Sequence, residues 1–264
     1  MSSIKKSDNI IVKKLNGDTE KYNPKKLRKS LKEAGADKEV INNILKKVEG
    51  ILYNGIETRK LFRFIHEELD KQRPQAGLKY NLKRAMFDMR VHGGFTFEKF
   101  IGRVLEKQGY KIEMNPLLKG AHVTHEIDIF AEKDNEKLMI EVKHHKKPGI
   151  IEPIQTALYV YARFLELKDK FTQPMLVTNT KFSNQVIKYS KGVGIKLMGW
   201  KYPRDNSLEE NIEKYKLYPV TILNLSKTQI RRYLQEGILT LQELKEQKKV
   251  SKKTREQINT LLNE

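Results

Sequence analysis

Two carboxylates and a lysine lie close together in the middle of the sequence, in segments that alternate apolar and polar residues. Asp128 lies within 126–130, and Glu141 and Lys143 lie within 139–143. Alternation of this kind predicts half-buried strands, and the short polar stretch between the segments predicts an antiparallel hairpin. Side chains two residues apart on one strand face lie roughly 6.5–7 Å from each other, so we expect the three side chains to converge. This set suits a Mg²⁺ ion and a water molecule directed at a phosphodiester.

Two other readings of this region are open from the residues alone. Glu126 shares a strand face with Asp128 and is an alternative metal ligand. A zinc site is suggested by four histidines, although zinc usually takes three or four ligands with an orienting second layer, and these residues are expected in loops or at strand ends. The histidines are His122, His125, His144 and His145.

The composition narrows the class of protein. A chain of 264 residues predicts two or three domains, and 38% hydrophobic residues suffice for small cores. No run approaches the roughly 18 apolar residues of a membrane span, and the N-terminus lacks the apolar core of a secretory signal. The sequence contains no cysteine, which excludes disulfides and thiolate metal sites, so we expect a cytoplasmic protein with no membrane partner.

The chain is strongly basic. It has 52 Lys and Arg against 33 Asp and Glu, a formal net charge of +19. Such a surface attracts polyanions, of which nucleic acid is the commonest, although a lysine-rich proteome produces the same composition. DNA is therefore the expected partner only if the catalytic residues also indicate chemistry on nucleic acid.

Helices and strands alternate around the carboxylates. The pattern predicts a helix from Phe95 to Gln108, then the hairpin, then a helix that starts near Glu152 and Pro153. A strand, a helix and a second strand follow, at 175–178, 183–190 and 195–198. This order indicates an α/β core with a mixed sheet, which we place at 93–202 after a break at His92-Gly93-Gly94.

The order of these residues resembles the PD-(D/E)XK restriction-endonuclease-like nucleases. Glu98 lies in the first helix, then come Asp128, the E-x-K element Glu141-Val142-Lys143, and Gln155 in the next helix. The strand–helix–strand from Met175 to Trp200 is similar to the Mrr-type branch of that superfamily. Gln155 and Tyr159 are similar to the Q-x-x-x-Y signature of the RecB-like nucleases.

The resemblance implies a role for each residue. Asp128 and Glu141 would bind Mg²⁺ with the Val142 carbonyl, and Glu98 would complete the metal shell or hold a second ion. Lys143 would orient or polarise the attacking water and stabilise developing charge. Gln155 would orient the active-site face or touch the DNA backbone. The structural alternative is that Glu98 is an exposed helix charge and that Gln155 packs against its neighbours.

The first 92 residues predict a separate, mostly helical unit. Asn16-Gly17 between two short apolar runs predicts a hairpin, and Asn23-Pro24 predicts a helix start that leads to a stop near Gly35. Further helices are expected at about 38–52, from Thr58 as a cap, and at about 75–90.

This segment resembles an ATP-cone, the regulatory nucleotide-binding module of ribonucleotide reductases. The resemblance implies that ATP or dATP is held by Val12, Lys14, Asn16, Gly17, Glu20, Asn23, Lys26, Thr58 and Lys83. Lysines would neutralise the triphosphate, and a glycine turn would let the backbone approach it. The chain has no P-loop motif, so we expect binding without turnover that shifts a conformational or oligomeric equilibrium, with a homo-oligomer, a dimer, as the expected assembly.

The last part, 203–264, predicts a small helical module behind a linker at 202–207. Its 223–244 segment resembles helix-hairpin-helix modules but lacks their glycine-rich phosphate-gripping hairpin, so DNA contact and partner binding are both open. In total the sequence predicts an α/β fold: a mostly helical ATP-cone with a small β-hairpin (1–92), a nuclease core with a mixed sheet (93–202) and a helical module (203–264). The function predicted is a nucleotide-regulated, Mg²⁺-dependent DNA endonuclease. The alternative is a non-catalytic DNA-binding regulator that responds to ATP or dATP.

Overall fold

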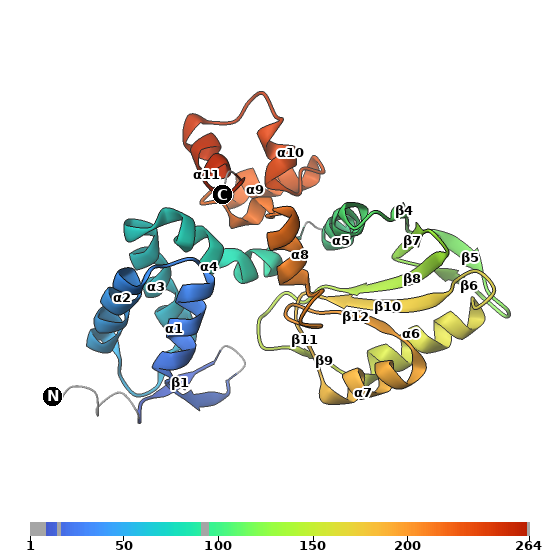
Figure 1. Ribbon diagram of the computed structural model, residues 1–264, viewed down its shortest axis with the longest axis horizontal. Helices are drawn as coiled ribbons and strands as arrows, with labels where there is room; N and C mark the ends of the chain where they lie inside the picture. Colours follow the sequence, from blue (N-terminus) through green and yellow to red (C-terminus); the bar gives the residue numbers. More distant parts are fainter. Residues whose placement is uncertain (1–8, 15–16, 91–94, 263–264) are drawn as a thin grey trace. The chain divides into compact units, whose positions relative to one another are not determined.

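The computed structural model of the protein describes residues 9–14, 17–90 and 95–262 (Figure 1). The chain divides into two compact units, 1–84 with 259–264, and 85–258. Within the described ranges, no helix combines the length and apolar character needed to cross a membrane. The α/β fold class expected from the sequence is confirmed, with helices at both ends of the chain and a mixed sheet between them. The three-domain division of the sequence stays a prediction.

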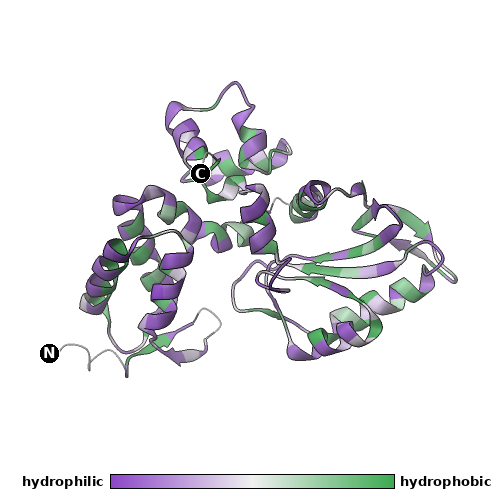
Figure 2. Ribbon diagram, in the orientation of Figure 1, coloured by the Kyte–Doolittle hydropathy of each residue, from purple (hydrophilic) through white to green (hydrophobic). Residues whose placement is uncertain are grey.

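The N-terminal unit combines a small sheet with helices. Strand β1 (Ile11–Lys13) pairs antiparallel with β2 (Thr19–Lys21) and parallel with β3 (Ile56–Glu57), which confirms the hairpin. The helices are α1 (Pro24–Glu33), α2 (Lys38–Ile51), α3 (Thr58–Gln72) and α4 (Pro74–Phe87). They alternate between hydrophobic and hydrophilic residues along their length (Figure 2). Their apolar sides pack around Leu31, Ile44 and Ile56, which are fully buried.

Local capping explains where α1 begins. The Asn23 side chain accepts hydrogen bonds from the backbone N–H groups of Lys25 and Lys26, so it satisfies donors that the first turn leaves free. The predicted role of Thr58 as a helix cap is wrong, because Glu57 holds the cap position and Thr58 is the first helical residue. Asn16 and the predicted break at 92–94 lie outside the described residues.

The second unit is built on a five-stranded mixed sheet of order β12-β10-β8-β7-β4. Its central strand β8 pairs antiparallel with β7 and parallel with β10, and β12 extends the parallel part. Beside this sheet lie two small strand pairs, β5-β6 and β9-β11. The strands are β4 (Lys111–Met114), β5 (Leu117–Lys119), β6 (Thr124–Glu126), β7 (Ile129–Lys133), β8 (Glu136–Lys143), β9 (Ile151–Glu152), β10 (Gln173–Thr178), β11 (Lys181–Phe182) and β12 (Lys196–Met198).

Helices cover both faces of the five-stranded sheet. Helix α5 (Thr96–Lys107) lies over one face, and α6 (Ile154–Glu166) and α7 (Asn184–Val193) lie against the other (Figure 1). The α6 side holds an apolar cluster that includes Met139, Val160 and Leu176. Because both faces are covered, β8 is buried over most of its length and Glu141 is only 5% exposed.

The expectation of half-buried strands joined by a polar connection at 131–138 is therefore wrong in detail. The hairpin strands extend further than expected, to Lys133 and from Glu136, and the turn between them contains only Asp134 and Asn135. The predicted strand 126–130 is also interrupted, because β6 ends and β7 begins on either side of Ile127 and Asp128. Apolar–polar alternation identified the strands, but turn length and the second helical layer depend on tertiary packing.

The C-terminal part of the chain is helical, as the tail composition predicts. It contains α8 (Leu208–Tyr215), the 3₁₀ turn η1 (Val220–Ile222), α9 (Lys227–Gln235), α10 (Leu241–Lys245) and α11 (Lys252–Leu262). Ser226 and Thr240 each cap a helix with reciprocal side-chain and backbone hydrogen bonds. Gly237 takes a positive φ of 76° between α9 and α10, where a residue with a side chain is strained.

Candidate active site

Glu141 and Lys143 project from the end of β8, where it pairs with the parallel strand β10. The register places Leu176 opposite Glu141 and Thr178 opposite Lys143. The Lys143 Nζ lies 2.5 Å from Glu141 Oε1, and the Thr178 hydroxyl donates to the Lys143 carbonyl at 2.9 Å. Burial alone would lower the pKa of Lys143, but the contact with Glu141 raises it, so this lysine is held as a cation.

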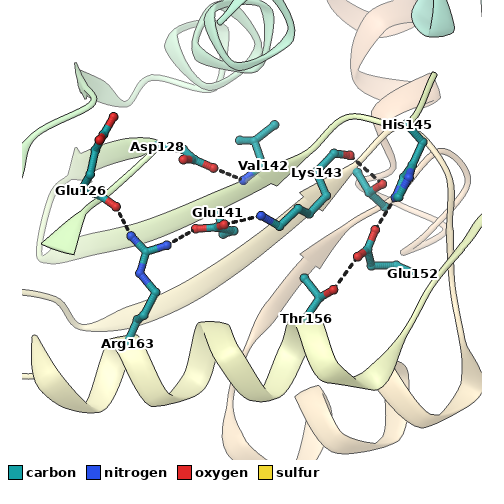
Figure 3. Close-up of polar contacts among 10 residues, drawn as sticks. Glu126, Asp128, Glu141, Val142, Lys143, His145, Glu152, Thr156 and Arg163 are labelled. Atoms are coloured by element: carbon teal, nitrogen blue, oxygen red, sulfur yellow. Dashed lines mark hydrogen bonds and ion pairs between the residues drawn. The ribbon is translucent and has the colours of Figure 1, made fainter.

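Asp128 joins this pair across the hairpin. It lies in the break before β7, and its Oδ2 accepts a 2.7 Å hydrogen bond from the Val142 backbone N–H (Figure 3). Its own carbonyl accepts from the Asn115 N–H at 3.1 Å, and Asn115 has a positive φ of 52°. The structure thus places Asp128, Glu141 and Lys143 beside one another, while their chemical roles stay predictions.

Glu98 faces the group from α5. Its Oε2 accepts a 3.3 Å hydrogen bond from the Asn115 side chain. Burial, and then the negative charges of Asp128 and Glu141, raise the pKa of Glu98 to about 7. Burial and the Glu141 charge likewise raise the pKa of Asp128 to about 6. Carboxylates that repel one another in this way form a region where a bound cation is stabilised.

Arg163 is a component that the sequence reasoning missed. It reaches from α6 toward Glu141, and its guanidinium donates to Glu141 Oε2 and to the Glu126 carbonyl (Figure 3). The residue is 7% exposed, and its guanidinium carbon lies 5.2 Å from the centre of the Tyr159 ring. A single arginine within the apolar run 157–165, four residues after Tyr159, was the available signal, since a charge there needs a buried partner.

The oxygen donors fit a Mg²⁺ ion held by few protein ligands. Asp128 and Glu141 would supply carboxylates and the Val142 backbone a carbonyl, and Mg²⁺ commonly binds one or two carboxylates while it keeps several waters. No group of three or more His, Cys, Asp or Glu residues suited to a metal occurs in the part of the chain that the structure describes. A closed site made of protein ligands alone is therefore not formed among these residues.

A second polar cluster follows Lys143 directly. The His145 Nε2 lies 2.6 Å from Glu152 Oε2, and the Thr156 hydroxyl donates to Glu152 Oε1 at 2.6 Å. The fully buried Asn179 holds the backbone of His145 at both its N–H and its carbonyl. Burial of Glu152 acts to raise its pKa, but the hydrogen bonds from His145 and Thr156 lower it overall. Sequence reasoning missed this cluster, because its members lie on three separate elements.

The other histidines are dispersed rather than grouped as in a zinc site. His122 contacts Glu166 through its ring and its backbone, and the His125 Nε2 lies 3.8 Å from the same carboxylate. His144 contacts the Met86 carbonyl at 2.8 Å.

Three further residues singled out from the sequence lie at the edge of the group. Gln155 is exposed on the first turn of α6, and Tyr159 is 54% exposed one turn later. The Glu126 carboxylate points away from Glu141, and only its carbonyl reaches Arg163 (Figure 3). Glu126 nevertheless contributes negative charge to the surroundings of Glu98.

The structure brings together part of the residue set predicted for nucleotide binding in the N-terminal unit. Glu20 Oε2 lies 3.0 Å from Lys14 Nζ and 3.3 Å from Lys26 Nζ, and these lysines hold the pKa of Glu20 below its usual value. Gly17 adopts a positive φ of 92° in the turn between β1 and β2, and the helix cap Asn23 lies two residues after β2.

The remaining predicted contacts of this set are more dispersed. Val12 is buried and pairs with Ile56, two residues before Thr58. Lys83 is exposed on α4. The geometry is therefore compatible with an anion beside the hairpin, and nucleotide binding stays a prediction.

Comparisons with known proteins address the second unit. Residues 90–201 match a family model described as a restriction endonuclease. An uncharacterized protein of Archaeoglobus fulgidus is 42% identical over 140 residues, which are 53% of this chain and 80% of the relative.

The chain is similar to a solved structure along most of that structure's length. The crystal structure of AF1548, described as a protein of unknown function, is 38% identical and has a TM-score of 0.52, over 62% of this chain and 94% of that one. A structure of Can2 from Sulfobacillus thermosulfidooxidans with cyclic tetra-adenylate gives a TM-score of only 0.34 at 13% identity, over 76% of this chain and 64% of that one. This chain therefore belongs to one family with the uncharacterized protein of Archaeoglobus fulgidus, and its residues 90–201 form a restriction-endonuclease-like domain with the nuclease-like fold of the PD-(D/E)XK superfamily.

Proposed function

We propose that this protein is a Mg²⁺-dependent DNA endonuclease whose activity responds to ATP or dATP bound by its N-terminal unit. One observation carries the proposal: Asp128, Glu141 and Lys143 meet at the end of β8 within a restriction-endonuclease-like domain. A domain of this kind that only holds DNA needs basic residues, but it does not need two carboxylates that repel each other beside a lysine.

The carboxylates and the lysine would have different roles in hydrolysis. Asp128, Glu141 and the Val142 carbonyl would hold Mg²⁺, which when bound supplies charge neutralisation at the phosphate and a water of lowered pKa. Lys143 would orient the attacking water and donate to the phosphoryl oxygen as its charge grows. Glu98 faces the same carboxylates from α5. It would accept a proton, or a hydrogen bond from a metal-bound water.

The charge of the chain supports DNA as the substrate. A formal net charge of +19 gives a favourable long-range interaction with the phosphate backbone. This term carries no sequence information, so it supports binding to nucleic acid in general.

The arrangement of charges supports a nucleotide in the N-terminal unit. Lys14 and Lys26 both lie within 3.3 Å of Glu20 Oε2, and the Gly17 turn allows the backbone to approach a phosphate. The Asn23 Oδ1 is committed to capping α1, so only its Nδ2 would contact a ribose or base. Binding without hydrolysis would shift an equilibrium between conformations or oligomers.

A dimer is the proposed assembly. Leu158 and Leu165 lie seven residues apart on α6 and are 46% and 48% exposed, and Tyr159 is exposed between them. Exposed apolar residues on one helix are typical of a surface that another protein covers. Light scattering coupled to size exclusion, with and without ATP, tests the assembly and its response to nucleotide.

The test of activity is direct. The protein is incubated with plasmid DNA and Mg²⁺, with and without ATP, beside Asp128→Ala and Lys143→Ala. We expect cleavage by the wild type and none by either variant. Absence of cleavage under every condition would refute the nuclease and leave a DNA-binding regulator. Cleavage that survives both substitutions would refute the site, and failure of calorimetry to detect ATP or dATP binding would refute the nucleotide module.

A further inference from the structure

Both oxygens of the Glu141 carboxylate are engaged by cations. Lys143 Nζ lies 2.5 Å from Oε1, and Arg163 Nη1 donates to Oε2. The carboxylate is also buried, so these contacts are poorly screened by water. A divalent ion that binds Glu141 must therefore approach an oxygen that already carries a cation.

The ion and one of these cations compete for the same oxygen. Mg²⁺ lies about 2.1 Å from its oxygen ligands, so an ammonium on the same oxygen would be within a few ångströms of it. Repulsion between a double and a single charge at that separation is strong in a partly buried site. The contact to the oxygen that takes the ion is therefore weakened.

The contacts differ in how firmly they are held. Arg163 lies on a helix, its side chain is 9% exposed, and it binds the Glu126 carbonyl as well as Glu141. The Lys143 side chain is 37% exposed, and among the described residues its ammonium has a hydrogen bond to Glu141 alone. A flexible four-carbon chain with solvent access is the one that moves.

Arg163 also connects the two sides of the proposed metal site. Glu126 precedes Asp128 by two residues, so one guanidinium fixes the strand end that carries Asp128 and the carboxylate of Glu141 together. A lysine at this position would keep the charge, but its single nitrogen would have to reach both oxygens, whereas Arg163 reaches Glu141 with Nη1 and the Glu126 carbonyl with Nη2.

From these contacts we infer that Arg163 is a permanent positioning residue for Glu141, whereas Lys143 is an exchangeable partner that the incoming metal ion displaces. The inference rests on the proposed function for the identity of the ion, but not for the exchange itself. Displacement frees the Lys143 ammonium only when the metal is bound, so the lysine becomes available for water and phosphate at the moment that it is needed. Loss of the Lys143 charge and loss of the Arg163 bridge are therefore expected to act in opposite directions on metal affinity.

The experiment measures metal binding without DNA or nucleotide. Mn²⁺ serves as the probe, because it accepts the same oxygen ligands as Mg²⁺ and its free form is counted by electron paramagnetic resonance. The full chain is titrated as wild type, Lys143→Met, Arg163→Lys and Asp128→Asn, with Lys147→Met as a control that removes an exposed charge four residues from Lys143. Circular dichroism and thermal melting confirm that each variant folds.

We expect Lys143→Met to bind Mn²⁺ about tenfold more tightly, since a competing charge beside the site is gone, and Lys147→Met to change binding by less than about twofold. Arg163→Lys should bind about tenfold more weakly, because charge without the bridge does not hold the carboxylate. Asp128→Asn should weaken binding and so locate the ion.

Two results for the lysines would overturn the exchange: Mn²⁺ binding by Lys143→Met that is unchanged or weaker, and tightening by Lys147→Met that equals that of Lys143→Met. Wild-type Mn²⁺ affinity in Arg163→Lys would also overturn it. So would an Mn²⁺ affinity that is unchanged in Asp128→Asn. If Arg163→Lys does not fold, the comparison of Lys143→Met with Lys147→Met decides alone. The binding pattern without plasmid cleavage by any form would refute the nuclease and leave the exchange standing.

Discussion

The Asp128 carboxylate accepts a 2.7 Å hydrogen bond from the backbone N–H of Val142, the residue between Glu141 and Lys143. The carboxylate in front of β7 is thereby tied to the strand that carries the other two side chains. Among the described residues this hydrogen bond uses Oδ2, so Oδ1 is the oxygen that we propose for a metal ion. This separation of the two oxygens allows the structural and the chemical role of Asp128 to be tested apart.

Asp128→Asn should keep the fold and lose catalysis. The asparagine oxygen can still accept from Val142, so the melting temperature should change little, but the charge that holds the metal is gone. Loss of metal-ion stabilisation amounts to several kcal/mol, and we expect plasmid cleavage to fall by roughly 100- to 1,000-fold. Initial rates at saturating Mg²⁺ measure this. Cleavage within a few-fold of the wild type would contradict a metal role for Asp128.

Glu98→Gln should stabilise the metal-free protein at pH 8. The pKa of Glu98 is raised from 4.5 to about 7 in the folded protein, so the folded state binds more protons than the unfolded state between these values. Stability is therefore highest at low pH and decreases as pH rises through this window. After discounting for solvent screening, the variant should gain about 1–2 kcal/mol at pH 8 and nothing at pH 4.

Melting temperatures of wild type and Glu98→Gln over pH 4–8 with EDTA test this. The difference in melting temperature between the two proteins should appear only above about pH 5 and reach a few degrees, given the usual entropy of unfolding. Added Mg²⁺ should reduce it, because a bound cation relieves the repulsion among the carboxylates. A gap that does not depend on pH would mean that Glu98 is an ordinary exposed acid.

Lys14→Met should weaken ATP binding by roughly 10- to 100-fold, since a charged hydrogen bond to phosphate is lost. Lys29→Met is the matched control, because Lys29 lies on α1 but is 78% exposed and paired with Glu33. Isothermal titration calorimetry measures both. Equal loss in the two variants would indicate a general charge effect, and no loss in either would remove Lys14 from the predicted contact set.

Glu152→Ala should destabilise the second unit by about 1–3 kcal/mol, because His145 and Thr156 lose a buried partner. The pKa of Glu152 is lowered in the folded protein, so this stability is present above its unfolded value and disappears as pH falls. Urea unfolding at pH 7 and at pH 4 should therefore show a smaller difference at pH 4. Glu106→Ala, at an exposed ion pair, should have almost no effect at either pH.

The placement of Asp128, Glu141 and Lys143 could be predicted because strand periodicity is a local property. Two apolar–polar alternations separated by a short polar stretch suffice to bring the side chains near one another. The break at Ile127 and Asp128 could not be predicted, since it depends on pairing of Asn115 and Pro116 with this segment. The same distinction applies to the N-terminal hairpin, which is local, and to the extent of α6, which is set by packing.

Arg163, Glu152 and His145 show why the rest of the candidate site was not found. Each is a charged or titratable residue whose partner lies at least seven positions away on another element. Periodicity reports which side of an element is apolar, but not which distant carboxylate will satisfy a buried guanidinium. Such partners become visible only when the sheet register and the helix positions are known.

The two-residue turn at Asp134 and Asn135 has a practical consequence. It lies at the end of β8 away from Glu141 and Lys143, and both turn residues are exposed. Every β7–β8 pair from Lys133↔Glu136 to Ile129↔Ile140 lies between this turn and the carboxylates. A fluorophore attached at Asn135 would therefore lie one full strand length from the candidate site, where it would not contact Asp128, Glu141 or Lys143.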